Sequence, residues 1–256
     1  MVSRIVNLFE TKAKHILIGY TVAGYPSLKG SMDVIKAMVN GGVDMLEIGI
    51  PFSDPIADGP TIQRASHTAL NNGMTPTLAL ELCENVRKEF DIPLSIMTYS
   101  NIPYRIGYDK FVKRAYEAGV DGLIIPDLDL EEAPKLKELL SKNDMNIILL
   151  VSPNTSKERI KVISNIATGF IYLVSVYGTT GARKTFEDYT RDAIVKVKRY
   201  SKLPLAVGFG ISNTEHVRFM LEAGADAVIV GSAFIDAIDK GNVEDFTKEL
   251  KRACYS

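Results

Sequence analysis

Cysteine and histidine are scarce in this chain of 256 residues, which has two of the first and three of the second. Cys83 and Cys254 form no CxxC motif, and His15, His67 and His216 are scattered without metal-ligand spacing. We therefore expect no metal in this chain. We interpret the two cysteines as unpaired thiols of a cytoplasmic protein.

Long apolar runs and clustered charge are also absent. No stretch approaches the roughly 18–20 apolar residues that a membrane span requires, and charged residues interrupt the first fifteen positions, which argues against a signal peptide. Lys and Arg number 30, Asp and Glu number 31, and no four basic residues are consecutive. Because general nucleic-acid binding needs a clustered basic surface, the sequence predicts neither a membrane nor a nucleic-acid partner.

Three segments repeat one pattern, at residues 42–49, 119–126 and 224–231. Each begins with Gly, has Asp two positions later and continues as a nearly unbroken apolar run. A glycine after a helix end tolerates the left-handed conformation that is common there. A short run that is apolar on both faces is typical of a buried parallel strand.

The whole chain can be divided into units of this kind. Eight units in 256 residues average about 32 residues each, which is the length of one strand, one helix and their connecting loops. We expect strands at 15–22, 43–50, 92–99, 122–127, 146–151, 169–174, 205–209 and 227–231. We expect helices at 28–40, 61–71, 76–90, 109–118, 131–141, 157–167, 192–201, 214–223 and 243–252.

This alternation predicts the fold class α/β, as a single (βα)8 TIM barrel over residues 1–256. An extra N-terminal helix is expected to bury Ile5, Leu8 and Phe9. An open doubly wound sheet is the structural alternative. No Pro/Ser-rich linker or low-complexity segment divides the chain.

Glu47 interrupts the apolar strand expected at 43–50. Strand alternation places it on the face of Val43, Met45 and Gly49. If that face is the barrel interior, burial without a partner raises the pKa of Glu47. Such an acid can donate and accept a proton near neutral pH. The alternative is a buried ion pair, but no Lys or Arg lies in the apolar part of a neighbouring strand.

Asp54 and Asp58 lie on the loop that follows this strand. In barrels of this class the chemistry lies at the C-terminal ends of the strands, so this loop can carry a second carboxylate opposite Glu47. A turn or helix cap is the ordinary interpretation of a lone Asp in such a loop. A metal-binding pair is a further alternative, although no histidine supports it.

Glycines follow the last three expected strands, at 178–181, 208–210 and 231–232. Small residues let backbone N–H groups approach an anion, and helix starts add a positive dipole end. Because barrels often bind phosphate after strands seven and eight, we predict a phosphate site there. The long segment 176–189 is interpreted as a lid, with a plain surface loop as the alternative. No Walker A, GxGxxG or GxSxG motif is present.

The segment from Leu46 to Gln63 resembles the signature of the tryptophan synthase α subunit family. Further segments similar to the family run the length of the chain, so the resemblance covers essentially residues 1–252. They are 20–26, 97–101, 126–128 with 131–132, 151–154, 172–175 with 178–183, 208–211 and 231–232. Two loops depart from common family patterns, at 99–103 and 126–129.

The resemblance implies a lyase that cleaves indole-3-glycerol phosphate to indole and glyceraldehyde 3-phosphate by a retro-aldol step. It implies that Glu47 is the general acid and base and that Asp58 holds the indole N–H. It implies a phosphate cradle, an indole pocket, a lid residue and a residue at a partner interface. These are Gly181, Gly210, Gly231 and Ser232 for the cradle, Tyr20, Tyr99, Tyr172 and Phe209 for the pocket, Thr180 for the lid and Asp54 for the interface.

The resemblance also implies a partner, the tryptophan synthase β subunit, in an α2β2 complex. Pyridoxal phosphate is then expected only in that subunit, and no cofactor in this chain. Three alternatives remain open. They are another phosphate-binding barrel enzyme such as indoleglycerol-phosphate synthase or a phosphoribosyl isomerase, a standalone indole-releasing lyase, and a mainly regulatory subunit with weak activity alone.

Overall fold

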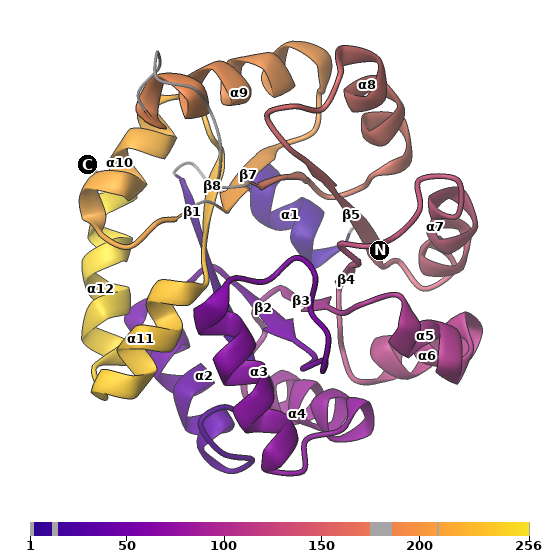
Figure 1. The fold of residues 1–256 in the computed structure, drawn as a ribbon, viewed down its shortest axis with the longest axis vertical. Coiled ribbons are helices and arrows are strands. Elements are labelled where there is room, and N and C mark those ends of the chain that lie inside the picture. Colours follow the sequence, from indigo (N-terminus) through magenta and orange to yellow (C-terminus); the bar gives the residue numbers. More distant parts are fainter. Residues whose placement is uncertain (1–2, 12–14, 175–185, 209, 256) are drawn as a thin grey trace.

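Eight parallel strands pair in chain order and close into a barrel through β1 and β8. The computed structural model describes residues 3–11, 15–174, 186–208 and 210–255. Figure 1 shows the helices as a ring around the strands. The expected barrel is confirmed. The strands are β1 (Ile16–Val22), β2 (Met45–Gly49), β3 (Leu94–Met97), β4 (Gly122–Ile124), β5 (Asn146–Val151), β6 (Ile171–Val174), β7 (Leu205–Gly208) and β8 (Ala227–Val230).

Twelve helices occur in the described part of the chain. They are α1 (Arg4–Thr11), α2 (Gly30–Gly41), α3 (Pro60–Asn71), α4 (Pro76–Glu89), α5 (Asn101–Ile106), α6 (Tyr108–Glu117), α7 (Ala133–Ser141), α8 (Lys157–Ile166), α9 (Phe186–Tyr200), α10 (Thr214–Glu222), α11 (Ser232–Lys240) and α12 (Val243–Ala253). The sequence did not predict α5 or α11, and it placed the start of α9 six residues late. None of the helices in the described ranges is long and apolar enough to cross a membrane.

The N-terminal helix α1 covers one end of the barrel. Ile5 is fully buried within the cluster of inward-facing strand residues, and Leu8 and Phe9 pack against that cluster. A side chain at Gly122 would meet the Cδ1 atom of Ile5 at 2.9 Å. The absence of a Cβ on β4 therefore leaves the space that Ile5 fills, and the amphipathic helix predicted from the sequence acts as a plug.

The Asp residues of the repeated pattern have a structural role that the sequence did not reveal. In each case the backbone N–H donates to the carbonyl of a residue at the start of the preceding strand, and the side-chain oxygen accepts that residue's N–H. Thr168 repeats the arrangement with its hydroxyl. We call these four residues the strand clamps. The pairs are Asp44 with Leu17, Asp121 with Leu94, Thr168 with Ile147, and Asp226 with Leu205.

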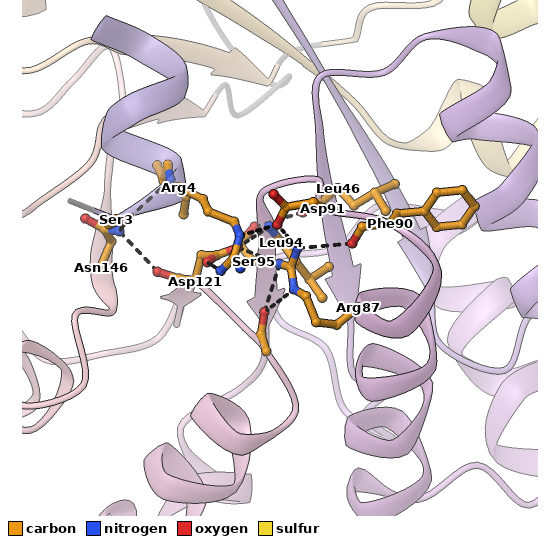
Figure 2. Close-up of polar contacts among 12 residues, drawn as sticks. Ser3, Arg4, Leu46, Arg87, Phe90, Asp91, Leu94, Ser95, Asp121 and Asn146 are labelled. Atoms are coloured by element: carbon orange, nitrogen blue, oxygen red, sulfur yellow. Dashed lines mark hydrogen bonds and ion pairs between the residues drawn. The ribbon is translucent and has the colours of Figure 1, made fainter. Parts of the chain in front are cut away.

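Each acidic clamp also binds a basic side chain, but the exposed fraction of the Asp side chain differs from one clamp to another. Asp121 receives Arg87 at 2.8 Å and Arg4 at 3.1 Å, so it joins α4 and α1 beneath the barrel (Figure 2). Its side chain is 8% exposed, whereas that of Asp226, paired with Lys198, is 37% exposed. The clamps hold the N-terminal ends of the strands and leave the C-terminal ends free to form a site.

Candidate active site

A cavity of about 720 Å³ opens at the C-terminal ends of the strands. Its wall includes Tyr20, Glu47 and Tyr172 from the barrel interior and Asp58 from the loop after β2. Within the described residues, no Lys, Arg or His lines it. The barrel mouth therefore brings together the two carboxylates that the sequence singled out.

Glu47 lies on the inward face of β2. In the strand register it pairs with Tyr20 of β1 and Ser95 of β3, both of which share that face. The side chain of Glu47 is fully buried, and neither carboxylate oxygen has a hydrogen-bond partner among the described residues. Burial, with a smaller contribution from the charge of Asp58, raises the pKa of Glu47 to about 8.

Stability measured against pH gives a direct test of this buried acid. The native state keeps the Glu47 proton up to a pKa of about 8, whereas the unfolded chain loses it near 4.5. Stability is therefore lost as the pH rises from 4.5 to 8, by about 1.4 kcal/mol per pH unit. Glu47→Gln, which does not titrate, is expected to raise the free energy of unfolding by about 3 kcal/mol at pH 7. Urea titrations of both proteins should show this advantage vanish below pH 4.5, and a constant difference would contradict it.

Asp58 is held from outside the cavity. Its carboxylate accepts a hydrogen bond from the Tyr99 hydroxyl at 3.1 Å, and its backbone carbonyl accepts one from Gln63 at 2.8 Å. Partial burial raises the pKa of Asp58 and the Tyr99 hydrogen bond lowers it. Glu47 and Asp58 therefore face one cavity in different environments, the first without partners and the second with them.

Two tyrosines shape the cavity between these groups. Tyr20 and Tyr172 each cover a glycine on an adjacent strand. A Cβ at Gly49 would lie 2.3 Å from the Tyr20 hydroxyl, and one at Gly208 would lie 2.4 Å from the Tyr172 ring. The two glycines leave the space that lets both rings lie against the wall.

The phosphate-binding residues expected from the sequence follow β7 and β8 at the same barrel mouth, where they are described. Gly210, Gly231 and Ser232 line the cavity. Ser232 is the first residue of α11, so the helix N-terminus is at the cavity wall. This arrangement suits an anion, since free backbone N–H groups and the helix dipole both favour negative charge there.

A family model described as "Tryptophan synthase alpha chain" matches residues 7–255. The chain is 44% identical over 254 residues to the tryptophan synthase alpha chain of Methanoregula boonei, covering 98% of this chain and 96% of that relative. It is 47% identical over 235 residues to that of Methanothermobacter thermautotrophicus, covering 92% and 87%. The chain belongs to the tryptophan synthase alpha chain family.

Solved structures agree with this assignment. A structure of Mycobacterium tuberculosis tryptophan synthase superposes with a TM-score of 0.91 at 33% identity and covers 99% of both chains. The tryptophan synthase subunit alpha of Legionella pneumophila has a TM-score of 0.91 at 34% identity, with coverage of 100% and 99%. The resemblance stated from the sequence is confirmed, and a closed barrel is the shared fold.

Some residues expected from the family pattern do not face the cavity or cannot be placed. Tyr99 is not part of the described cavity wall, because its hydroxyl binds the loop that carries Asp58. Asp54, which was expected at a partner interface and not in the cavity, is exposed and accepts a hydrogen bond from the Ser53 hydroxyl at 2.5 Å. Thr180, Gly181 and Phe209 lie outside the described residues, as does most of the segment interpreted as a lid.

Several cavity residues were missed by sequence reasoning. Among the apolar ones are Ile62, Met97, Leu150, Val174 and Ile229. Four of them face inward on their strands, so the alternation that identified Glu47 was a signal for them too. Asp236 was missed for a different reason, since it lies one turn after Ser232 on α11, a helix that was not predicted. The described residues contain no group of three or more His, Cys, Asp or Glu side chains suited to a metal ion.

Proposed function

We propose that this member of the tryptophan synthase alpha chain family cleaves indole-3-glycerol phosphate to indole and glyceraldehyde 3-phosphate, with Glu47 and Asp58 as its catalytic residues. The main support is Glu47, a fully buried carboxyl group with no hydrogen-bond partner among the described residues and a pKa of about 8, in a cavity that also contains Asp58. A carboxyl group in this state is matched to proton transfer near neutral pH.

The retro-aldol reaction needs one proton added and one removed. Protonated Glu47 gives its proton to C3 of the indole ring, which leaves a cationic iminium at the ring nitrogen. Asp58 stabilises that positive charge through the indole N–H. The Glu47 carboxylate then takes the proton of the hydroxyl on the adjacent side-chain carbon, the bond from that carbon to C3 breaks, and its electron pair returns to the ring. Indole and the aldehyde leave, and Glu47 is protonated again.

The substrate phosphate is held by main-chain groups in this proposal. Gly210, Gly231 and Ser232 line the cavity beside the start of α11, and the described wall has no basic side chain. A doubly charged phosphate at that position is stabilised by backbone N–H donors and by the helix dipole. The phosphate end fixes the indole ring against Tyr20 and Tyr172, above Glu47.

The decisive experiment is incubation of the purified chain with indole-3-glycerol phosphate. Indole and glyceraldehyde 3-phosphate should form in equal amounts, measured by chromatography and by a coupled dehydrogenase assay. Turnover of a phosphoribosyl substrate without release of indole would instead support another phosphate-binding barrel enzyme.

The remaining parts of the proposal concern the partner. We propose that the chain acts in the cytoplasm with a tryptophan synthase β subunit in an α2β2 complex, and that pyridoxal phosphate belongs to that subunit. Ile56, on the loop between β2 and α3 that also carries Asp54, is 82% exposed. Tyr104 on α5 is 78% exposed, so apolar surface is available to a partner near the cavity mouth. Co-purification with a β chain that contains pyridoxal phosphate, and a faster indole release in its presence, would support the complex. Equal rates with and without it would favour a standalone lyase.

A further inference from the structure

The side chain of Tyr99 contacts the loop between β2 and α3 through both its ring and its hydroxyl. Its ring stacks on Phe52, with centroids 5.3 Å apart and planes at 29°. Its hydroxyl accepts the N–H of Ala57 at 3.0 Å and donates to the Asp58 carboxylate at 3.1 Å. The Tyr99 side chain therefore holds the loop between β2 and α3 at three points, which are Phe52, Ala57 and Asp58.

The side chain of Tyr99 is rigidly placed. It is 5% exposed and follows β3 by two residues. Ser100 beside it is fixed in turn, since its N–H and hydroxyl both donate to Asp127, at 2.8 and 2.6 Å. The loop between β2 and α3 is thus attached to a buried side chain on the barrel rim, and the attachment ends on the carboxylate that faces the cavity.

We infer that Tyr99 is a positioning residue, which holds the Asp58 carboxylate in its orientation toward the cavity. The inference rests on the proposed function and replaces an indole-pocket role for Tyr99. Four other titratable groups line the cavity with Asp58, namely Glu47 on β2, Tyr20 on β1, Tyr172 on β6 and Asp236 on α11. Among the described residues none of these four is hydrogen-bonded to Asp58, whereas the Tyr99 hydroxyl is and favours its charged form.

The balance of effects on Asp58 gives the direction of the expected change. Burial raises the pKa of Asp58, and the hydrogen bond from Tyr99 lowers it. Without the hydroxyl, the first effect acts alone and the carboxylate takes up a proton more readily. The N–H of Ala57 also loses its acceptor, so the loop loses two of its three attachments.

Tyr99→Phe tests the inference because it keeps the ring that stacks on Phe52 and removes only the hydroxyl. We expect kcat for indole release to fall about tenfold or more, as for a lost hydrogen bond to a charged group, while KM changes little. The acid limb of the pH profile should move to higher pH, and raising the pH should restore part of the lost rate. Tyr116→Phe on α6, which changes a half-exposed tyrosine far from the cavity, should match the unchanged protein.

Two results would overturn the inference. An unchanged kcat and pH profile would show that the hydroxyl does nothing for Asp58. A raised KM with an intact kcat would return Tyr99 to the pocket wall.

A measurement without turnover separates this inference from the proposed function. The Asp58 carboxyl carbon can be followed by NMR against pH, with its signal assigned through Asp58→Asn. Its pKa should be higher in Tyr99→Phe than in the unchanged chain, and an identical titration would overturn the inference. Absence of indole release from the unchanged chain would reject the proposed function, while the NMR titration would still decide the role of Tyr99.

Discussion

Glu47→Gln is expected to reduce indole release by a factor of about 10²–10⁴, the usual contribution of one general acid and base. The amide has nearly the same shape as the carboxyl group but cannot give up and recover a proton at the indole carbon and the side-chain hydroxyl. Because Glu47 is fully buried and has no hydrogen-bond partner among the described residues, the change breaks no hydrogen bond with them. Steady-state kinetics should therefore show a loss in kcat with KM largely kept.

The control for this experiment is a surface glutamate. Glu84→Gln on α4 removes a carboxylate paired with Lys88 on an exposed helix face, so its rates should equal those of the unchanged chain. If Glu47→Gln retained full activity, Glu47 would have no part in proton transfer. If it lost activity but also unfolded at lower urea concentration at pH 7, the loss would be structural. That outcome would contradict the buried, protonated state described for Glu47.

Asp121→Ala is expected to cost about 3–5 kcal/mol of folding free energy, the range for removing one partner of a buried ion pair. The guanidinium of Arg87, with a side chain only 16% exposed, would lose its 2.8 Å partner, and the N–H of Leu94 would lose its acceptor. Arg4 would lose one of its two links to the barrel, which loosens α1. Urea unfolding followed by circular dichroism measures the loss.

The chain contains its own control for this prediction. Asp226→Ala removes the same clamp contact, to the N–H of Leu205 at 2.7 Å, but its cation Lys198 is 41% exposed. Water can solvate Lys198 after the change, so the expected cost is about 1 kcal/mol, the value of the lost backbone hydrogen bond. Equal costs at the two positions would show that the buried ion pair adds nothing beyond the clamp.

The repeated Gly-x-Asp pattern explains why the barrel could be predicted from the sequence. Its three glycines, Gly42, Gly119 and Gly224, all adopt positive φ angles between 77° and 108°. In each repeat the apolar run begins directly after Asp. Local backbone chemistry and strand burial therefore marked three of the eight strand starts. The function of Asp in the clamp was not predictable, because it depends on a backbone group 21 or 27 residues away.

The two helices that were missed show where local patterns are weak. Helix α5 contains Pro103 within its six residues, and proline is usually taken as a break. Helix α11 begins at Ser232, inside the segment interpreted as an anion site, and no range was predicted for a helix there. In both places the barrel geometry brings the chain into a helix right after a strand, which a short window of sequence does not indicate.

The candidate site was predictable in part for similar reasons. The position of Glu47 in an apolar strand, with no nearby basic residue, was enough to predict a buried acid with a raised pKa. The direction of the Tyr99 hydroxyl was not predictable, since an aromatic residue after a strand equally suits a pocket wall or a brace. The structure also contains a buried lysine, but Lys251 pairs with Asp44 at the other end of β2 and leaves Glu47 alone.

The spacing of the strand clamps has a consequence for how the chain reaches its native state. The clamped residues are 27, 27, 21 and 21 positions apart along the chain, so each clamp closes only a short loop. Short loops cost little closure entropy and lower the contact order. Four strand–helix–strand units can thus form from nearby residues. The seam between β1 and β8, where Ile16 donates to the carbonyl of Asp226, must by contrast wait for both ends of the chain.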